Sequence, residues 1–397
     1  MKKVENKEVK QVKVIKKKKI KISWIIFLSV IAILIIVYFC LPQYARKALI
    51  HLTPDIDDLK LFPTNIVVAE NPEVLKYHKK YNENDLDPAY RQDIEKLDPV
   101  AYIVLKDGKL FYEEYWEGYN ETSLSNTFSA SKSLIGLLIG IAIDNGFIGS
   151  TNDIITQYIP EFDDRYDFIT IENMLTMSSG LSWDEGYSSL FSTTTEAYYG
   201  KDLKALILEQ EPTKRPGKEF YYSSGSTALL GLILTNATGM SVSEFASKYL
   251  WSQIGAEQDA QWSLDQKGGL EKSYCCFYSN ARDLARVGQL ILQHGRWEGK
   301  QIISKSYLEK SFTPASYLRD EENYRVDYYG YQWWLLKYKY YNIKYARGIY
   351  GQYIITIPEH DVVIVRLGHK RDDVRVGAHP KDVFLYINAA MDLIGRQ

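Results

Sequence analysis

Cysteine is scarce in this sequence, with three copies in 397 residues. Cys40 lies inside an apolar run, and Cys275 and Cys276 are direct neighbours. Such a set cannot form a framework of long-range disulfides, which excludes the small disulfide-stabilised folds. Because 46% of the residues are hydrophobic and 25% are charged, we expect a globular protein whose stability comes from a packed core.

Histidine is also scarce, and the six copies show no H-E-x-x-H or comparable ligand spacing. The chain lacks a G-x-S-x-G elbow, so a Ser-His-Asp triad of that type has no place for its serine. We therefore expect neither a metal nor another cofactor.

An excess of positive charge is absent from the main body of the chain. Residues 1–22 carry ten Lys against Glu5 and Glu8, a charge of +8, and the rest must then carry −10 of the total of −2. An acidic body argues against nucleic acid as a partner.

The Lys-rich segment precedes the strongest physical signal in the sequence, the nineteen uncharged residues 23–41. At about 1.5 Å per residue a helix of this length spans nearly all of a hydrocarbon layer ~30 Å thick. A buried core helix or a cleaved signal peptide are the alternatives, but no small-residue cleavage pattern follows Tyr38. We predict a single-pass anchor in the cell membrane, with the amino terminus in the cytoplasm and the later residues outside.

The chain divides into four predicted parts. Residues 1–22 form the cytoplasmic segment, 23–41 the anchor, 42–90 a proline-containing stalk and lead-in, and 91–397 one large domain.

Within that domain, strand patterns lie near both ends and helical patterns lie between them. Residues 101–115 predict a hairpin around Lys106-Asp107-Gly108, and further strands are predicted at 329–336, 352–358 and 361–367, followed by a helix at 381–394. We therefore predict an α/β fold in which both ends of the domain build one antiparallel sheet, flanked by helices and an all-α sub-region.

The candidate chemistry begins at Ser129, in the sequence Phe128-Ser-Ala-Ser-Lys-Ser133, which opens an apolar helix. A serine in the first turn lies near free backbone N–H groups, and Lys132, three residues on, shares its helix face. A buried lysine with a lowered pKa can take the serine proton and create a nucleophile. An ordinary helix cap is the alternative, because a bare S-x-x-K motif also arises by chance.

A second element is Tyr222, which follows Pro216-Gly217 and precedes another apolar helix. A phenol near a lysine ammonium can be held partly as phenolate and serve as a second base. Tyr187 and Tyr278 also stand in Tyr-x-Ser or Tyr-x-Asn patterns, but Tyr278 precedes a segment for which Asn280 is a plain helix cap. We favour Tyr222.

Together these elements resemble the serine β-lactamase and penicillin-binding-protein-like hydrolases, in particular the class C-like branch. The resemblance runs from about Val100 to Ile394 and rests on six stretches: 104–115, 128–133, 169–185, 216–225, 280–292 and 348–365. It implies the β-lactamase-like fold, with Ser129 as the acylated nucleophile, Lys132 as its activating partner and Tyr222 as the base of the second motif.

Within that branch the sequence is similar to the 6-aminohexanoate-dimer hydrolase-like members, which have Tyr-x-Ser in the second motif, here Tyr222 and Ser224. The resemblance also implies substrate contacts by Tyr187. The third motif departs from the family, because Tyr345-Ala-Arg-Gly348 lacks the usual Lys or His.

At this third motif, either Lys344 or Arg347 is left to supply a positive charge to the substrate. By its place after Gly348, Ile349 is expected to offer a backbone N–H to the oxyanion, together with the N–H of Ser129. Arg347, Gly348 and Ile349 complete the predicted substrate-binding set.

The sequence thus predicts a membrane-anchored, outward-facing serine hydrolase that cleaves an amide or ester through an acyl-enzyme on Ser129. Its partners would be a small-molecule or cell-wall substrate and, through residues 23–41, the lipid bilayer. A D-alanyl peptidase or esterase of the cell wall and a catalytically silent sensor or scaffold are the alternatives.

Overall fold

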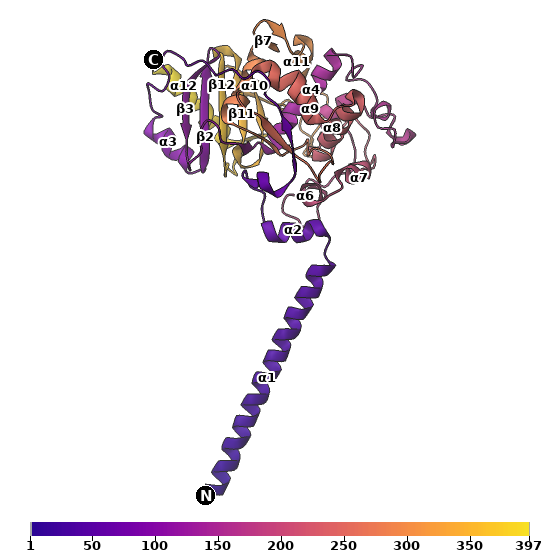
Figure 1. The fold of residues 1–397 in the computed structure, drawn as a ribbon, viewed down its shortest axis with the longest axis vertical. Helices are drawn as coiled ribbons and strands as arrows, with labels where there is room; N and C mark the ends of the chain where they lie inside the picture. The colour runs from indigo at the N-terminus through magenta and orange to yellow at the C-terminus, as the bar shows by residue number, and fades with distance from the viewer. Residues whose placement is uncertain (1, 397) are drawn as a thin grey trace. The chain divides into compact units, whose positions relative to one another are not determined.

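The computed structural model describes residues 2–396, which fall into two compact units with the boundary between Thr53 and Pro54. The first unit contains helix α1 (Lys2–Cys40) and helix α2 (Gln43–His51). Figure 1 shows α1 as one continuous helix. An 18-residue window within α1 has a mean hydropathy of 2.8 and no buried residue, so the helix is long and apolar enough to cross a membrane. A signal sequence has the same properties.

The second unit is built around a six-stranded antiparallel sheet with the strand order β3-β2-β12-β11-β10-β9. Its strands come from both ends of the unit, as the sequence predicted: β2 (Pro99–Lys106), β3 (Lys109–Tyr115), β9 (Trp334–Tyr338), β10 (Tyr341–Arg347), β11 (Tyr353–Ile357) and β12 (Val362–Gly368). Tyr102 faces Glu114 on one side and Arg366 on the other, so the first hairpin and the last strand meet in the middle of the sheet.

The predicted hairpin forms because Asp107 and Gly108 both have positive φ, at 52° and 69°. Two successive residues with positive φ are characteristic of the tight turn whose twist matches two antiparallel strands, and Asp-Gly suits it. Lys106 therefore pairs with Lys109 across the turn.

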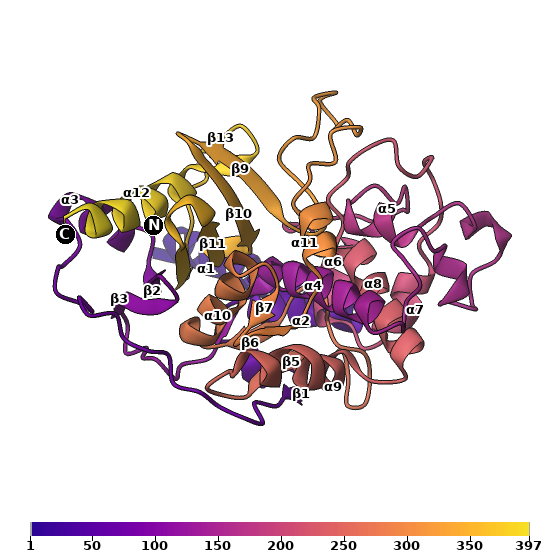
Figure 2. The ribbon, with the colours of Figure 1, turned by 90° about the horizontal axis from the view of Figure 1, so that it is seen from above.

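Two helices cover the sheet. Helix α10 (Ala281–Leu292) packs on β12, β11 and β2, and helix α12 (Lys381–Gly395) packs on β12 and on the short α3 (Pro88–Glu95). Figure 2 shows α10 and α12 on opposite faces of the sheet. The side that carries α12 is rich in buried tyrosines, among them Tyr102, Tyr353 and Tyr386.

The helical sub-region contains the two apolar helices of the motifs, α4 (Ser131–Asp144) and α8 (Ser224–Thr238), which contact each other. The other helices of the second unit are shorter: α5 (Ile171–Leu175), α6 (Thr193–Tyr199), α7 (Leu203–Leu208), α9 (Val242–Ala246) and α11 (Lys305–Ser311).

A second sheet, which the sequence did not predict, has the order β1-β5-β6-β4. It joins β1 (Thr64–Val67), β4 (Ser125–Asn126), β5 (Ala260–Ser263) and β6 (Phe277–Ser279). Part of the segment described above as stalk and lead-in therefore belongs to the second unit, since β1 pairs with β5. The smallest strand pairs are β7 (Arg296–Trp297) with β8 (Lys300–Gln301) and β13 (Arg375–Val376) with β14 (His379–Pro380).

One predicted strand begins later than expected. Residues 329–333 are irregular, and β9 starts only at Trp334. The reason is Gln332, which has a φ of 62° and directs its side-chain nitrogen to the carbonyl oxygens of Met174 and Leu175 at the end of α5. The backbone is thus turned to satisfy the end of a helix, and it cannot also run as a strand.

Candidate active site

Ser129 lies in a short 3-10 turn between β4 and α4. The preceding residue, Phe128, has a φ of 44°, which a non-glycine residue rarely adopts, and its N–H is held by the side-chain oxygen of Asn126 at 2.9 Å. Strain of this kind persists only where the surroundings impose it, and it fixes the direction in which the next side chain points.

Lys132 lies one turn further along, with 1% of its surface exposed. Its Nζ lies 3.1 Å from Ser129 Oγ, 3.0 Å from Ser224 Oγ and 2.8 Å from the carbonyl oxygen of Tyr274. Burial lowers the pKa of the Lys132 ammonium to about 8, while the Glu185 carboxylate acts in the opposite direction. The amine thus reaches its neutral form far more readily than a lysine in water.

Helix α8 brings the second motif to the same place. The Ser223 side chain caps the helix through the N–H of Ser226, and Ser224 begins the first turn with its hydroxyl on Lys132. Tyr222 precedes the cap, and its ring centroid lies 5.2 Å from Lys132 Nζ. The structure therefore brings together Ser129, Lys132, Tyr222 and Ser224, which are separated by up to 95 positions in the sequence.

The environment of Tyr222 does not favour the partly ionised phenol that the sequence suggested. Burial, followed by the Glu185 carboxylate, raises the pKa of Tyr222 well above its usual range, and the interactions with Ser129 and Arg347 only partly offset this. Tyr222 is a neutral O–H group at physiological pH. Of the two candidate bases, only Lys132 has a pKa lowered toward neutral pH, where its unprotonated form can accept a proton.

Glu185 is a part of the site that the sequence reasoning missed. It accepts hydrogen bonds from the N–H and the hydroxyl of Ser224, both at 2.7 Å, and from the hydroxyl of Tyr187. A carboxylate at the start of α8 is stabilised by the free N–H groups there. The one sequence signal for Glu185 was its position at the end of the stretch 169–185, two residues before Tyr187. A single glutamate in a predicted loop does not by itself indicate a role in an active site.

Tyr187 has 56% of its surface exposed, yet its hydroxyl reaches Glu185 and the residue lines the same cavity as Ser129. Tyr278, the competing tyrosine, lies elsewhere. It is buried in β6, where its hydroxyl accepts a hydrogen bond from Asn126, and Asn280 caps α10 as the sequence suggested.

The end of β10 contributes the third predicted element. Gly348 packs so closely that a Cβ atom would lie 2.3 Å from the carbonyl oxygen of Thr127, which excludes any side chain there. Tyr350 has a φ of 60°, and its ring packs against Phe128 at 5.6 Å between centroids. Among residues 2–396, the backbone N–H groups of Ser129 and Ile349 have no hydrogen-bond acceptor.

Of the two residues that could supply a positive charge to the substrate, Arg347 lies at the cavity and Lys344 does not. Arg347 lines the cavity, with its guanidinium 3.2 Å from the centroid of Trp334 and one nitrogen donating to the carbonyl oxygen of Ala378 at 2.9 Å. Lys344 points to the other face of the strand, where its Nζ lies over the Phe312 ring at 5.8 Å. It does not line the cavity.

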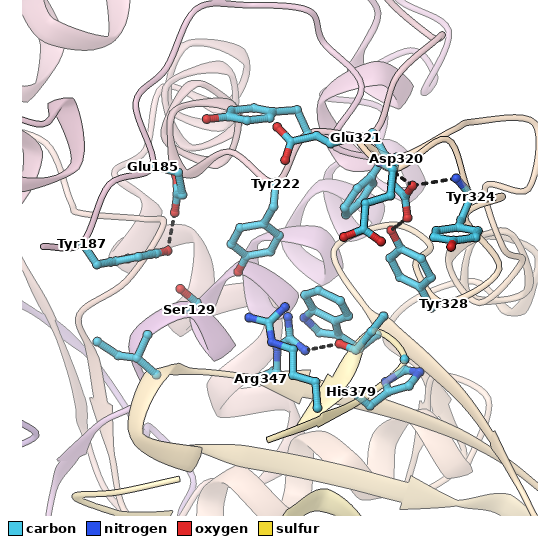
Figure 3. A pocket seen from close by; sticks show the side chains of 18 of the residues that line it. Ser129, Glu185, Tyr187, Tyr222, Asp320, Glu321, Tyr324, Tyr328, Arg347 and His379 are labelled. Atoms are coloured by element: carbon cyan, nitrogen blue, oxygen red, sulfur yellow. Dashed lines mark hydrogen bonds between the residues drawn. The ribbon is translucent and has the colours of Figure 1, made fainter. Parts of the chain in front are cut away.

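The cavity has a volume of about 1030 Å³. Ser129, Tyr187, Tyr222, Arg347, Gly348 and Ile349 all line it, together with acidic residues of the segment 320–327 and arginines of the segment 371–375. Figure 3 shows the hydroxyls of Ser129 and Tyr222 opening into it, with Arg347 and His379 on one side and Asp320 and Glu321 on the other. The arrangement offers a nucleophile, a base with a lowered pKa, a hydroxyl donor and two free N–H groups around one space.

One group of side chains has the composition of a metal site. Asp55, Asp57 and His369 each offer a ligand atom within 4.8 Å of the others, but the two aspartates are exposed and none of the three lines the cavity. Exposed carboxylates gather in this way without binding a metal, so no role follows from the group.

Comparison with known proteins gives a consistent result. The β-lactamase family model matches residues 90–385, which is most of the chain. The 6-aminohexanoate-dimer hydrolase of Paenarthrobacter ureafaciens is 29% identical over 327 residues, covering 77% of this chain and 82% of its own.

Solved structures support the fold. A Bacillus anthracis protein provisionally named as a 6-aminohexanoate-dimer hydrolase superposes with a TM-score of 0.72 at 23% identity, covering 86% of this chain and 92% of its own. A class C β-lactamase superposes with a TM-score of 0.57 at 18% identity, covering 80% and 98%. At these identities the superpositions show the shared fold and nothing finer.

Proposed function

The chain belongs to the β-lactamase family, and from that premise we propose that it is a serine hydrolase that cleaves an amide or ester bond through an acyl-enzyme on Ser129. The observation that carries the proposal is the position of Lys132 Nζ, 3.1 Å from Ser129 Oγ, in a buried site that lowers the pKa of this lysine to about 8. A lysine on the protein surface would stay hydrated and protonated, and its pKa would not be lowered.

In the proposed acylation step, neutral Lys132 takes the proton of the Ser129 hydroxyl, and Oγ forms a bond to the substrate carbonyl carbon. The other two partners of Nζ, Ser224 Oγ and the Tyr274 carbonyl, both accept from the resulting ammonium. The charge created on Lys132 is therefore held by hydrogen bonds that already exist, so little reorganisation is needed.

The negative charge that develops on the carbonyl oxygen requires donors. Ser129 and Ile349 both line the cavity, and their N–H groups, which have no acceptor among the described residues, are proposed as these donors. Loss of one such donor typically costs about 10²–10³ in kcat. The positive φ of Phe128, directly before the Ser129 N–H, restricts the direction of that group. The close packing of Gly348 against the Thr127 carbonyl oxygen does the same for the Ile349 N–H that follows it.

Tyr222 is proposed to donate its proton to the leaving nitrogen or oxygen as the carbonyl–heteroatom bond breaks, and to regain a proton from Lys132. Its raised pKa keeps it protonated for this step. Water then attacks the acyl carbon, the proton returns through the same groups, and Ser129 is released with a carboxylic acid product.

Simple esters and linear amides are the proposed substrates rather than lactams. The residue at the usual Lys or His of the third motif is Ala346, whose side chain is fully buried and uncharged. We expect short p-nitrophenyl esters to be cleaved faster than penicillins.

Helix α1 supports a proposal about location. A Lys-rich half followed by an uncharged half favours a single-pass anchor with the amino terminus in the cytoplasm and the hydrolase outside the membrane. In intact cells an added protease should then remove the region after Pro42 and spare an amino-terminal tag. Such a location also favours the narrower alternative, a D-alanyl peptidase or esterase that acts on the cell wall.

The test of the central proposal is covalent labelling. A fluorophosphonate probe should add its mass to the peptide that contains Phe128–Lys132, and Ser129→Ala should abolish the addition. Ser131→Ala is the matched control, because this serine lies in the same peptide but donates to the carbonyl oxygen of Ser273 and is absent from the cavity. Labelling or turnover that survives in Ser129→Ala would favour a different nucleophile or a silent binding protein.

A further inference from the structure

Three arginines gather along one wall of the cavity. Arg347 ends β10, and Arg371 and Arg375 come from the segment that follows β12. All three line the cavity together with the nucleophile Ser129. Neither Arg371 nor Arg375 belongs to any of the motifs in the sequence.

These arginines are not neutralised by ion pairs. Among residues 2–396, no carboxylate oxygen lies within 4.0 Å of a guanidinium nitrogen of Arg347, Arg371 or Arg375. The buried carboxyl group of Asp382 interacts electrostatically with Arg371, but it is hydrogen-bonded to the hydroxyl of Tyr353 at 3.1 Å. Asp372 and Asp373 stand between Arg371 and Arg375 in the sequence, but neither of them lines the cavity.

The positive charge of these arginines contributes to lowered pKa values of the ionisable side chains nearby. Burial and then Arg347 lower the pKa of His379 to about 4, so this histidine is neutral in the wall. Burial, Arg347 and Arg371 lower the pKa of Arg375. Holding like charges together costs free energy, and a bound anion would relieve that cost.

The opposite wall carries the other sign. Asp320, Glu321, Glu322 and Asp327 line it, and Arg325 is the one basic residue of that segment that reaches the cavity. Figure 3 shows Asp320 and Glu321 well apart from Arg347. Asp320 is itself held by the hydroxyl of Tyr328 at 2.9 Å and the N–H of Tyr324 at 2.8 Å. The cavity therefore separates its charges instead of pairing them.

We propose that Arg347, Arg371 and Arg375 form an anion subsite, so that the substrate of Ser129 is an ester or amide with a carboxylate or phosphate group at one end and no negative charge at the other. This inference rests on the proposed hydrolase function and adds the substrate class. Guanidinium groups match both anions with paired N–H donors, and a second negative charge would meet the acidic wall.

Two sets of esters test the proposal on the full-length protein. The first keeps the p-nitrophenolate leaving group and changes the acyl chain from butyrate to hydrogen glutarate and to 4-aminobutyrate, which are neutral, negative and positive. The second keeps the butyryl group and changes the leaving group from phenol to 4-hydroxybenzoate and to 4-hydroxyphenyl phosphate. The second set distinguishes a carboxylate from a phosphate preference.

In at least one set the anionic ester should have a kcat/KM about tenfold above that of the neutral ester, the size expected for one charge-assisted hydrogen bond. The preference should weaken as salt is added, because the subsite is open to solvent. Equal kcat/KM values for anionic and neutral esters in both sets would overturn the proposal.

Charge-removing variants locate the preference. Arg371→Gln and Arg375→Gln should each lower the ratio of anionic to neutral kcat/KM several-fold, chiefly through KM. The lysine variants at both positions should restore part of it, which a merely structural role would not explain. Lys370→Gln, an exposed neighbour outside the cavity, removes the same charge and should keep the ratio. An equal effect of Lys370→Gln would show that only net charge matters and would overturn the subsite.

The two proposals fail in different ways. If the neutral esters are cleaved in a Ser129-dependent manner but no charge preference exists, the subsite is wrong and the hydrolase stands. If no ester is cleaved and no serine is labelled, both are wrong.

Discussion

The two sides of the cavity differ in how they are built. On one side the functional groups come from two helix starts, α4 and α8, where Ser129, Lys132 and Ser224 are held by hydrogen bonds of 3.0 to 3.1 Å. The remaining walls, here called the loop side, are formed by the end of β10 and by the segments 320–327 and 371–375, which present arginines on one wall and carboxylates on another without pairing them. The helix side is suited to chemistry, and the loop side to substrate choice.

This difference predicts which variants affect turnover and which affect selectivity. A substitution on the helix side should reduce turnover of every substrate, whereas one on the loop side should act according to substrate charge. The following variants test this division.

The largest effect is expected for Lys132→Ala. Removal of the base should lower kcat for all esters by about 10³-fold or more, within the range seen when a member of a catalytic unit is lost. In the wild-type protein, kcat/KM should rise with pH and level off above about pH 8, because Lys132 must lose its proton before it can act as a base. A pH profile without this step would contradict the assignment of Lys132.

Gly348→Ala should have the next largest effect. The added Cβ would meet the Thr127 carbonyl oxygen at 2.3 Å, so the backbone must shift and carry the Ile349 N–H with it. We expect kcat to fall about 10²-fold, as for the loss of one oxyanion donor. Overpacking should also destabilise the fold by about 1–3 kcal/mol.

Gly118→Ala is a control for the glycine change at a position where a Cβ has no neighbour within 4 Å, although its φ of 77° carries its own strain. Urea titration separates the stability change from the change in kcat.

Glu185→Gln should have a smaller effect with a distinct signature. The negative charge of Glu185 raises the pKa of Lys132, so its removal should move the midpoint of the pH profile to lower pH. Gln can still accept one hydrogen bond from Ser224, and we expect kcat to fall about tenfold because one charge-assisted bond is weakened. A midpoint that moves to higher pH would mean that Glu185 acts in another way.

Lys344→Gln should have the smallest effect. Lys344 lies on the opposite face of β10 from the cavity, with its Nζ over the Phe312 ring, so both kcat and the preference for anionic esters should change less than about twofold. A selective loss of anionic ester turnover would return Lys344 to the role that we assign to Arg347.

The residues of the helix side could be predicted from the sequence because the signals for them are local. Ser129 and Lys132 are three residues apart, and a helix places such residues on one face whatever surrounds them. The apolar residues that follow them predict burial, and burial predicts a lowered lysine pKa. The same local reasoning predicted the Asp107-Gly108 hairpin, and it favoured Tyr222 over Tyr278 because Tyr222 follows Pro216-Gly217 and precedes an apolar helix.

The sequence by itself therefore determined the long apolar amino-terminal helix, the antiparallel sheet from both ends of the domain and the spacing of Ser129 and Lys132. Only the tertiary structure decided the rest. Strand alternation places Lys344 and Arg347 on opposite faces of β10, but the packing of the sheet selects Arg347 for the cavity. Glu185, Arg371 and Arg375 reach the site from segments without regular periodicity, and charge separated across a cavity exists only once the chain has folded.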